Sequence, residues 1–293
     1  MDIVLALTAA LFFAFGTVLQ QRAGLEKPAS SEGAGLLVQM AKRPVWLAGI
    51  AADAIGFLCQ AVALAVGRLA VVQPLLVATV VFALPLGAKL TGQKVRRTDV
   101  LAALVVLASL IAFLLIADPT GGIDDAPLDQ WLIAIGACAA VCVPIFFLRK
   151  RGTPGRRAAA LGTATGILFA LSAAFTKVVA DQFEEGLFEI FVNWHLYALI
   201  VVGYASMTFN QLALNTGALA PAVATSLAFD PIASVVLGVT LLDESLHTSP
   251  LGIAGTVLAL GAALGGMTVL ARSQSQAEGP GGQTPAEPSP APA

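Results

Sequence analysis

Two carboxylates lie inside long apolar stretches of the sequence, where little water is available to stabilise a charge. Asp53 and Asp230 are each flanked on both sides by mainly apolar residues. An ionisable side chain at membrane depth costs free energy unless it is paired, so each needs a physical reason. Such a group can accept a proton, contact a cation or hold a substrate amine. A protonated acid that is hydrogen-bonded to a neighbouring helix is the structural alternative, and the sequence leaves it open.

Five uncharged amide side chains lie near the ends of apolar stretches. At membrane depth they can replace water around a polar solute, or they can bond helices to one another. Because proline removes a backbone donor, Pro74 and Pro231 are expected to bend the helices that contain them. The expected solute-binding or coupling side chains, besides Asp53 and Asp230, are Gln20, Gln60, Gln73, Asn210 and Gln211.

The sequence does not predict an enzyme. His195 and His247 have no nearby nucleophile and no metal-ligand spacing, and no phosphate loop or HExxH motif is present. Cys138 and Cys142 share a helix face, but no histidine or carboxylate accompanies them, so they do not indicate a metal site. We therefore expect no catalytic residue, no metal ligand and no cofactor.

The elements that position these side chains are nine apolar stretches. The 293-residue chain is 57% hydrophobic and only 12% charged, against roughly 25% charged residues in soluble domains. Because about 20 apolar residues span a bilayer, we expect one all-α membrane domain over residues 1–271, embedded in lipid. The tail 272–293 is rich in proline and small polar residues and is expected to be disordered. The predicted spans are 3–21, 45–66, 69–90, 100–117, 130–148, 158–180, 195–216, 218–242 and 250–271.

Charges predict the orientation of these spans. With nine crossings, all Lys and Arg residues except Arg68 and Lys177 fall on the side of the C-terminus. Positive charges favour the cytoplasmic side, so we expect the C-terminus inside, the N-terminus outside and a location in the plasma membrane. Lys177 is expected to extend to the headgroups. Short interfacial helices are expected at 32–43 and 183–194, with Trp46, Trp131 and Trp194 at headgroup depth.

The sequence contains a weak internal repeat. Gly67 and Gly217 lie 150 positions apart and each interrupts two apolar spans. Repeat 1 (about 3–117) matches repeat 2 (about 158–271), with 130–148 as a linking helix. Because matching helices are five crossings apart, the two halves are expected to lie antiparallel, as in many transporters. Further matching pairs are Leu64 with Leu214, Leu69-Ala70 with Leu219-Ala220, Gln93 with Glu244, and Gln20-Gln21 with Thr176-Lys177.

The chain resembles the drug/metabolite transporter (DMT) superfamily, of the EamA-like type. The resemblance rests on two inverted halves and on Leu241-Leu242-Asp243-Glu244-Ser245-Leu246 after the penultimate span. Within it, the segments 16–25 and 72–75 are most similar to the NIPA-type magnesium transporters. The chain departs from that branch at Phe57, where the branch has Glu, and at Gln60, where it has Asn.

These observations together predict a secondary transporter. The expectation is that it moves a small solute by alternating access, with proton coupling through Asp53 or Asp230. Magnesium or another divalent cation is the alternative that the resemblance implies, although magnesium prefers more oxygen ligands than two carboxylates supply. A membrane scaffold without transport is a remote alternative. The expected partners are lipid and a small-molecule or ion substrate, not nucleic acid, and both monomer and homodimer remain open.

Overall fold

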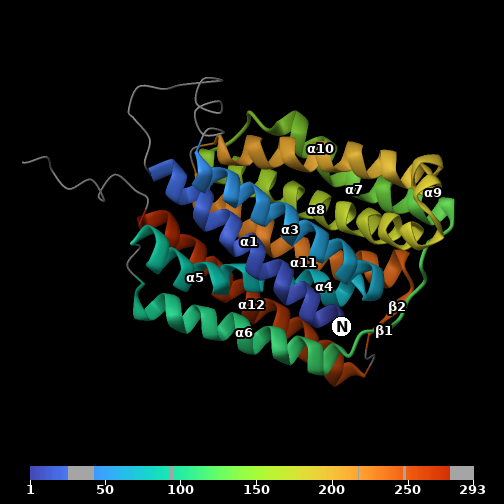
Figure 1. Cartoon of the computed structure of the whole chain (residues 1–293), viewed down its shortest axis with the longest axis horizontal. Helices are drawn as coiled ribbons and strands as arrows, with labels where there is room; N and C mark the ends of the chain where they lie inside the picture. Colours follow the sequence, from blue (N-terminus) through green and yellow to red (C-terminus); the bar gives the residue numbers. More distant parts are fainter. Residues whose placement is uncertain (26–42, 93–94, 217, 247–248, 278–293) are drawn as a thin grey trace, which may run out of the picture.

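Nine helices of the described chain are long and apolar enough to cross a membrane. The computed structural model describes residues 1–25, 43–92, 95–216, 218–246 and 249–277. Successive spans run in alternating directions along one common axis (Figure 1). The protein is therefore an all-α, multi-pass membrane protein, as the composition predicts.

The nine predicted spans are each confirmed, with shifts of a few residues at their ends. The first four crossings are α1 (Asp2–Leu25), α3 (Pro44–Val66), α4 with α5 (Leu69–Leu76 and Ala78–Thr91) and α6 (Arg97–Ala117). The last five are α7 (Leu128–Leu148), α8 (Pro154–Glu185), α10 (Trp194–Leu214), α11 (Leu219–Leu241) and α12 (Pro250–Ala277). The short helix α9 (Leu187–Val192) lies within the predicted segment 183–194, and the strands β1 (Thr120–Gly121) and β2 (Glu244–Ser245) form an antiparallel pair.

The two expected proline bends differ in the structure. The third crossing is divided into α4 and α5 at Val77, whose N–H bonds to the carbonyl of Pro74 three residues back. The interruption lies three residues after Pro74, where a bend was expected. By contrast, α11 continues through Pro231 without a break.

The helix α12 corrects one predicted boundary. It continues to Ala277, so residues 272–277, which we expected in the disordered tail, are helical. The predicted interfacial helix at 32–43 lies almost entirely outside the described residues.

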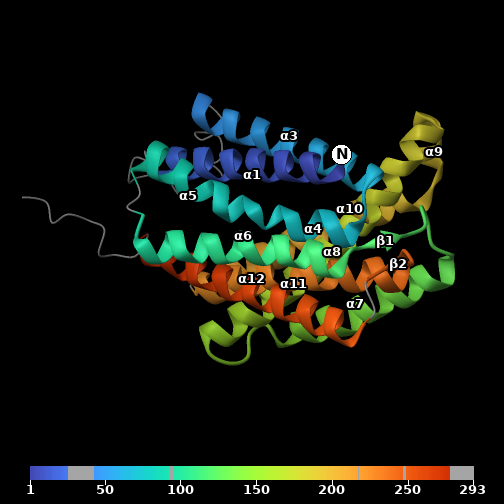
Figure 2. The ribbon, with the colours of Figure 1, turned by 90° about the horizontal axis from the view of Figure 1, so that it is seen from below.

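The two halves of the chain pack in similar ways. In the first half α1 lies against α3 and against α4 with α5, and in the second half α8 lies against α10 and α11. The fourth and last crossings, α6 and α12, pack against each other (Figure 2). The helix α7 contacts mainly α8, and only Trp131, Cys138 and Cys142 among its residues are buried. This arrangement supports the sequence repeat, which itself stays a prediction.

Glycines allow the closest helix contacts. A Cβ atom at Gly162 would lie 2.3 Å from the carbonyl oxygen of Ala222, so α8 and α11 touch through their backbones. Gly166, one turn further, meets the backbone of Ser226 in the same way. This GxxxG spacing places both glycines on one face of α8, where small residues let helices approach in a membrane.

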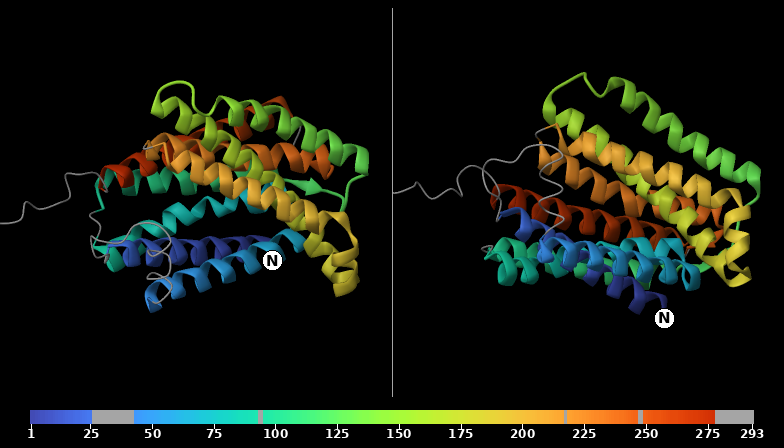
Figure 3. Two further views of the ribbon diagram at one scale, coloured as in Figure 1. Left: turned by 90° about the horizontal axis from the view of Figure 1, so that it is seen from above. Right: turned by 45° about the horizontal axis from the view of Figure 1, so that its top comes forward.

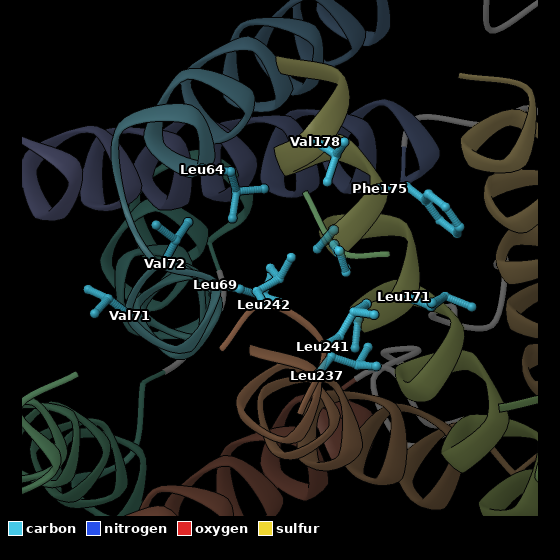
Figure 4. Packing of buried hydrophobic residues seen from close by; sticks show 14 of the residues in the cluster. Leu64, Leu69, Val71, Val72, Leu171, Phe175, Val178, Leu237, Leu241 and Leu242 are labelled. Carbon is cyan, nitrogen blue, oxygen red and sulfur yellow. The ribbon is translucent and has the colours of Figure 1, made fainter. Parts of the chain in front are cut away.

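The largest buried cluster lies at the end of the molecule where the N-terminus is found. It joins the α3–α4 hairpin to α8 and α11, with Leu64, Leu69, Phe175 and Leu241 among its fully buried members (Figure 4). Apolar side chains of the two halves therefore interlock at this end.

The position of Trp131 corrects a prediction. We expected it in the aromatic belt at headgroup depth, but its side chain is fully buried within the protein. Its ring stacks on Phe175 with centroids 4.3 Å apart, and its Nε1 donates a hydrogen bond of 2.9 Å to Asp125. Trp194, by contrast, is partly exposed. Buried indole rings with a paired N–H are common in packed cores, and sequence position alone does not separate them from belt residues.

The α8–α11 contact predicts the effect of one methyl group. In Gly166→Ala the new Cβ would lie 2.6 Å from the carbonyl oxygen of Ser226, so the helices must separate. We expect the free energy of unfolding to fall by about 1–3 kcal/mol, the usual cost of overpacking. Thermal unfolding of the purified protein in detergent measures the change. Gly203→Ala is the matched control, because nothing lies within 4 Å of its added methyl group. Equal stability of the two variants would contradict the role of the glycine contact.

Candidate functional site

The first intramembrane carboxylate is held between α1 and α3. Asp53 is half-buried, and its Oδ2 accepts a hydrogen bond from Nε2 of Gln20. The carboxylate fits because Gly16 has no side chain; a Cβ there would overlap it. Two of the predicted residues, Asp53 and Gln20, are thus brought together by the packing of the first two crossings.

The second intramembrane carboxylate lies on α11. Oγ of Ser234, one turn further along, donates a hydrogen bond of 3.4 Å to Oδ1 of Asp230. Gly166 of α8 lies opposite, since a Cβ there would be 2.8 Å from the backbone nitrogen of Asp230. Asp230 therefore sits at a close contact between α8 and α11, with one polar neighbour on its own helix.

Gln73 on α4 is the most deeply buried of the predicted polar residues. Its side chain is 4% exposed, and its Nε2 has no hydrogen-bond partner among the described residues. A buried donor without a partner is rare in proteins and costs free energy, so it needs an explanation. The position immediately before Pro74 puts this donor where α4 is about to end.

The other three predicted residues do not join these groups in one place. Gln60 belongs to α3 and leads to the α3–α4 hairpin, whereas Asn210 and Gln211 lie near the end of α10. These two connections lie at opposite ends of the molecule (Figure 1). Gln211 is also exposed, while Gln60 and Asn210 are half-buried. Flanking residues of two antiparallel hairpins cannot form one cluster, so a single site built from all of them is not found.

Sequence reasoning missed the role of Glu244, which is 2% exposed. Its two carboxylate oxygens accept hydrogen bonds from the backbone N–H groups of Leu69 (2.6 Å) and Ala70 (2.8 Å), at the start of α4. A carboxylate satisfies the unpaired N–H groups of a helix start and interacts favourably with its dipole. Burial raises the pKa of the Glu244 carboxyl, while the two N–H groups, Lys177 and Arg68 act in the opposite direction.

The position of Lys177 corrects a third prediction. We expected its ammonium group to extend to the headgroups, but the side chain is buried, with 6% of the residue exposed. Its Nζ donates to the carbonyl oxygen of Leu64 at 3.2 Å and pairs with Asp181 at 3.3 Å. Leu64 is in the last turn of α3, so Lys177 satisfies a carbonyl at one helix end while Glu244 satisfies N–H groups at the next helix start.

The signal for this cluster was present in the sequence. Glu244 lies in the segment on which the family resemblance rests, and Lys177 is one of two cations on its side of the predicted membrane. Arg68, the other cation, donates from Nε to the carbonyl of Gly121 at 3.0 Å. A cavity of about 190 Å³ lies between these groups, lined by Arg68, Asp124, Lys177 and Glu244 and by residues 65–67 and 121–123.

A larger groove of about 520 Å³ lies between α7 and α11 and is almost wholly apolar. Ile133, Val141, Phe229 and Val236 are among its lining residues, with Gln130 and Thr240 near one end. None of the seven predicted solute or coupling residues lines this groove or the smaller cavity. Within the described chain, no group of three or more His, Cys, Asp or Glu side chains is placed to hold a metal ion.

The chain was compared with known families, proteins and structures. No family model matches it, and no solved structure matches it. It is 30% identical over 247 residues to an uncharacterized protein of Corynebacterium glutamicum, and the match covers 84% of this chain and 86% of that protein. Similarity of this level over most of both chains means that they share one architecture. The chain belongs to the same family as this uncharacterized Corynebacterium glutamicum protein.

Proposed function

We propose that the protein is a secondary transporter that moves a small polar or amphipathic solute across the plasma membrane by alternating access. The observation that carries the proposal is the pair of carboxylates within its spans. One lies in each half, and each has a polar neighbour from the same half: Gln20 for Asp53, and Ser234 for Asp230. Carboxylates at this depth are the usual elements of proton relays and solute sites in membrane carriers.

The unpaired donor of Gln73 supports the same proposal. A scaffold gains nothing from a buried amide that lacks a partner, because an apolar residue of the same size would be more stable there. An acceptor atom of the solute, or an ordered water in the solute site, would satisfy the Nε2 donor of Gln73. Gln73 is therefore the residue through which we expect an uncharged part of the solute to be recognised.

The sidedness and the inverted repeat belong to the proposal as well. The cation-rich helix ends face the cytoplasm, and the end with Glu244 and Lys177 faces outward. The DMT resemblance supports two antiparallel halves and alternating access. No observation on the described residues favours magnesium over an organic solute, so Mg²⁺ is tested together with organic solutes.

Replacement of the carboxylates tests proton coupling. Proteoliposomes that contain a pH-sensitive dye are exposed to a panel of amino acids, amines, sugars and Mg²⁺. We expect one solute class to change the internal pH, and we expect this signal to fall to the level of protein-free liposomes in Asp230→Asn or Asp53→Asn, because an amide cannot take up the proton. Exchange of labelled solute across the same membrane should persist.

Asp129→Asn, at an exposed site at the start of α7, is the matched control and should behave like the unaltered protein. An unchanged pH signal in the double variant of Asp53 and Asp230 would exclude coupling through these residues. Failure of every panel solute to enter would instead favour a scaffold.

Replacement of Gln73 separates function from stability. Gln73→Leu removes a buried unpaired donor, so we expect the melting temperature to stay equal or to rise, with a gain of up to about 1–3 kcal/mol. Solute uptake should nevertheless be lost. Gln182 is the matched control: its Oε1 also has no partner among the described residues, but its Nε2 is 3.1 Å from Nδ1 of His195, so Gln182→Leu loses a bond and should lower the melting temperature. Full uptake by Gln73→Leu would show that the amide has no part in solute recognition.

A further inference from the structure

The two halves of the molecule are joined unequally at its two ends. At the N-terminal end α3 packs against α8, and Lys177 of α8 bonds to the carbonyl of Leu64 in α3. The same end holds the bonds of Glu244 to the start of α4 and the interlocked apolar cluster of Figure 4. The hydrogen bonds and the apolar contacts between the two halves thus lie at the same end of the molecule.

The matching helix pair does not repeat this contact. By the sequence repeat, α3 corresponds to α10 and α8 to α1, so the counterpart of the α3–α8 contact is one between α10 and α1. Among the described residues α1 and α10 make no contact of similar extent. The pair α1–α3 and the pair α8–α10 approach each other at the end that holds the N-terminus and diverge toward the other end (Figure 3, left).

In an antiparallel repeat, contacts that form between the halves at one end and not at the other indicate one of two conformers. If the two halves have similar folds, the molecule can exchange the contacts of one end for the matching contacts of the other end. A structure in which one set is formed and the other is not is then one of two conformers. Here the conformer is closed at the N-terminal end.

We propose that Lys177 and Glu244 are the gate residues that hold this end closed, and that Gln21 takes the place of Lys177 at the opposite end in the alternate conformer, where it would donate to the carbonyl of Leu214. The inference rests on the proposed transport function and names the positioning residues of its conformational step. Gln21 and Leu214 are the repeat counterparts of Lys177 and Leu64.

The chemistry of the gate suits reversible opening. In the closed state a buried ammonium group and a buried carboxylate are each satisfied by backbone groups of one hairpin, so their loss of water is compensated. In the open state both charges return to water, which replaces those bonds. Gly238 makes the closed state accessible, since a Cβ there would lie within 2.4 Å of a Glu244 oxygen.

A pair of reporter thiols tests the gate without any solute. In a background with Cys59, Cys138 and Cys142 replaced by Ala, the reporters Leu64→Cys and Leu214→Cys are made in separate proteins. The reaction of each thiol with a water-soluble maleimide is measured in lipid nanodiscs, where both faces are open to the reagent. Both substitutions leave the backbone carbonyls in place.

Lys177→Met should weaken the closed end. We expect the thiol at position 64 to react about tenfold faster, because one charge-assisted hydrogen bond shifts a two-state equilibrium by about that factor. The thiol at position 214 should react more slowly, since the opposite end then closes. Glu244→Gln should shift both rates in the same directions, and Gln21→Leu should shift both in the opposite directions. Lys89→Met, an exposed cation outside the gate, should change neither rate.

The reciprocal change is what separates a gate from a structural tie. If Lys177→Met raised the reaction rate at position 64 and did not lower it at position 214, the cluster would be a local support and the inference would be wrong. Unchanged rates at both positions would overturn it as well. Because the labelling needs no solute, a reciprocal change without uptake of any panel solute would leave the gate standing and reject the proposed transport.

Discussion

The backbone groups at a break between two spans must find partners inside the molecule, and much of this structure follows from that constraint. The chain turns at Gly67 between α3 and α4, so carbonyls at the end of one helix and N–H groups at the start of the next lose their intrahelical partners. Lys177 supplies a donor to Leu64, and Glu244 supplies two acceptors, from a position 175 residues beyond Leu69. The hairpin of the first half is therefore completed by the second half.

This dependence explains why the largest buried cluster surrounds the hairpin. Leu64 and Leu69 flank the turn, and both are fully buried against side chains of α8 and α11. Apolar packing around the hairpin shields part of these two polar contacts from water and strengthens them, and a cavity of about 190 Å³ lies between the charged groups. Loss of either charge would leave backbone groups of the hairpin without their protein partner, so the apolar and polar contacts support each other.

The spans were predictable from sequence because a long apolar stretch has few alternatives in lipid. A bend was predicted at Pro74, and the third crossing is divided three residues after it; the contact of Asp53 with Gln20 joins two predicted residues. Lys177 and Glu244 stand out in the sequence, but their partners were not predictable, because these are backbone atoms that carry no sequence signal. The prediction for Trp131 was wrong for a related reason. A tryptophan at the start of a span can belong to the aromatic belt or be buried, and only the folded positions of Phe175 and Asp125 show that this ring is buried.

The helix α7 determines the direction in which all later helices cross the membrane. It buries few residues and contacts mainly α8, so it contributes little to the packing of the bundle. Its crossing nevertheless fixes the direction of every later helix. Without it α8, α10, α11 and α12 would all enter the membrane from the other face, and Glu244 would meet the wrong end of α4. A helix with few contacts thus determines which ends of the two halves can meet.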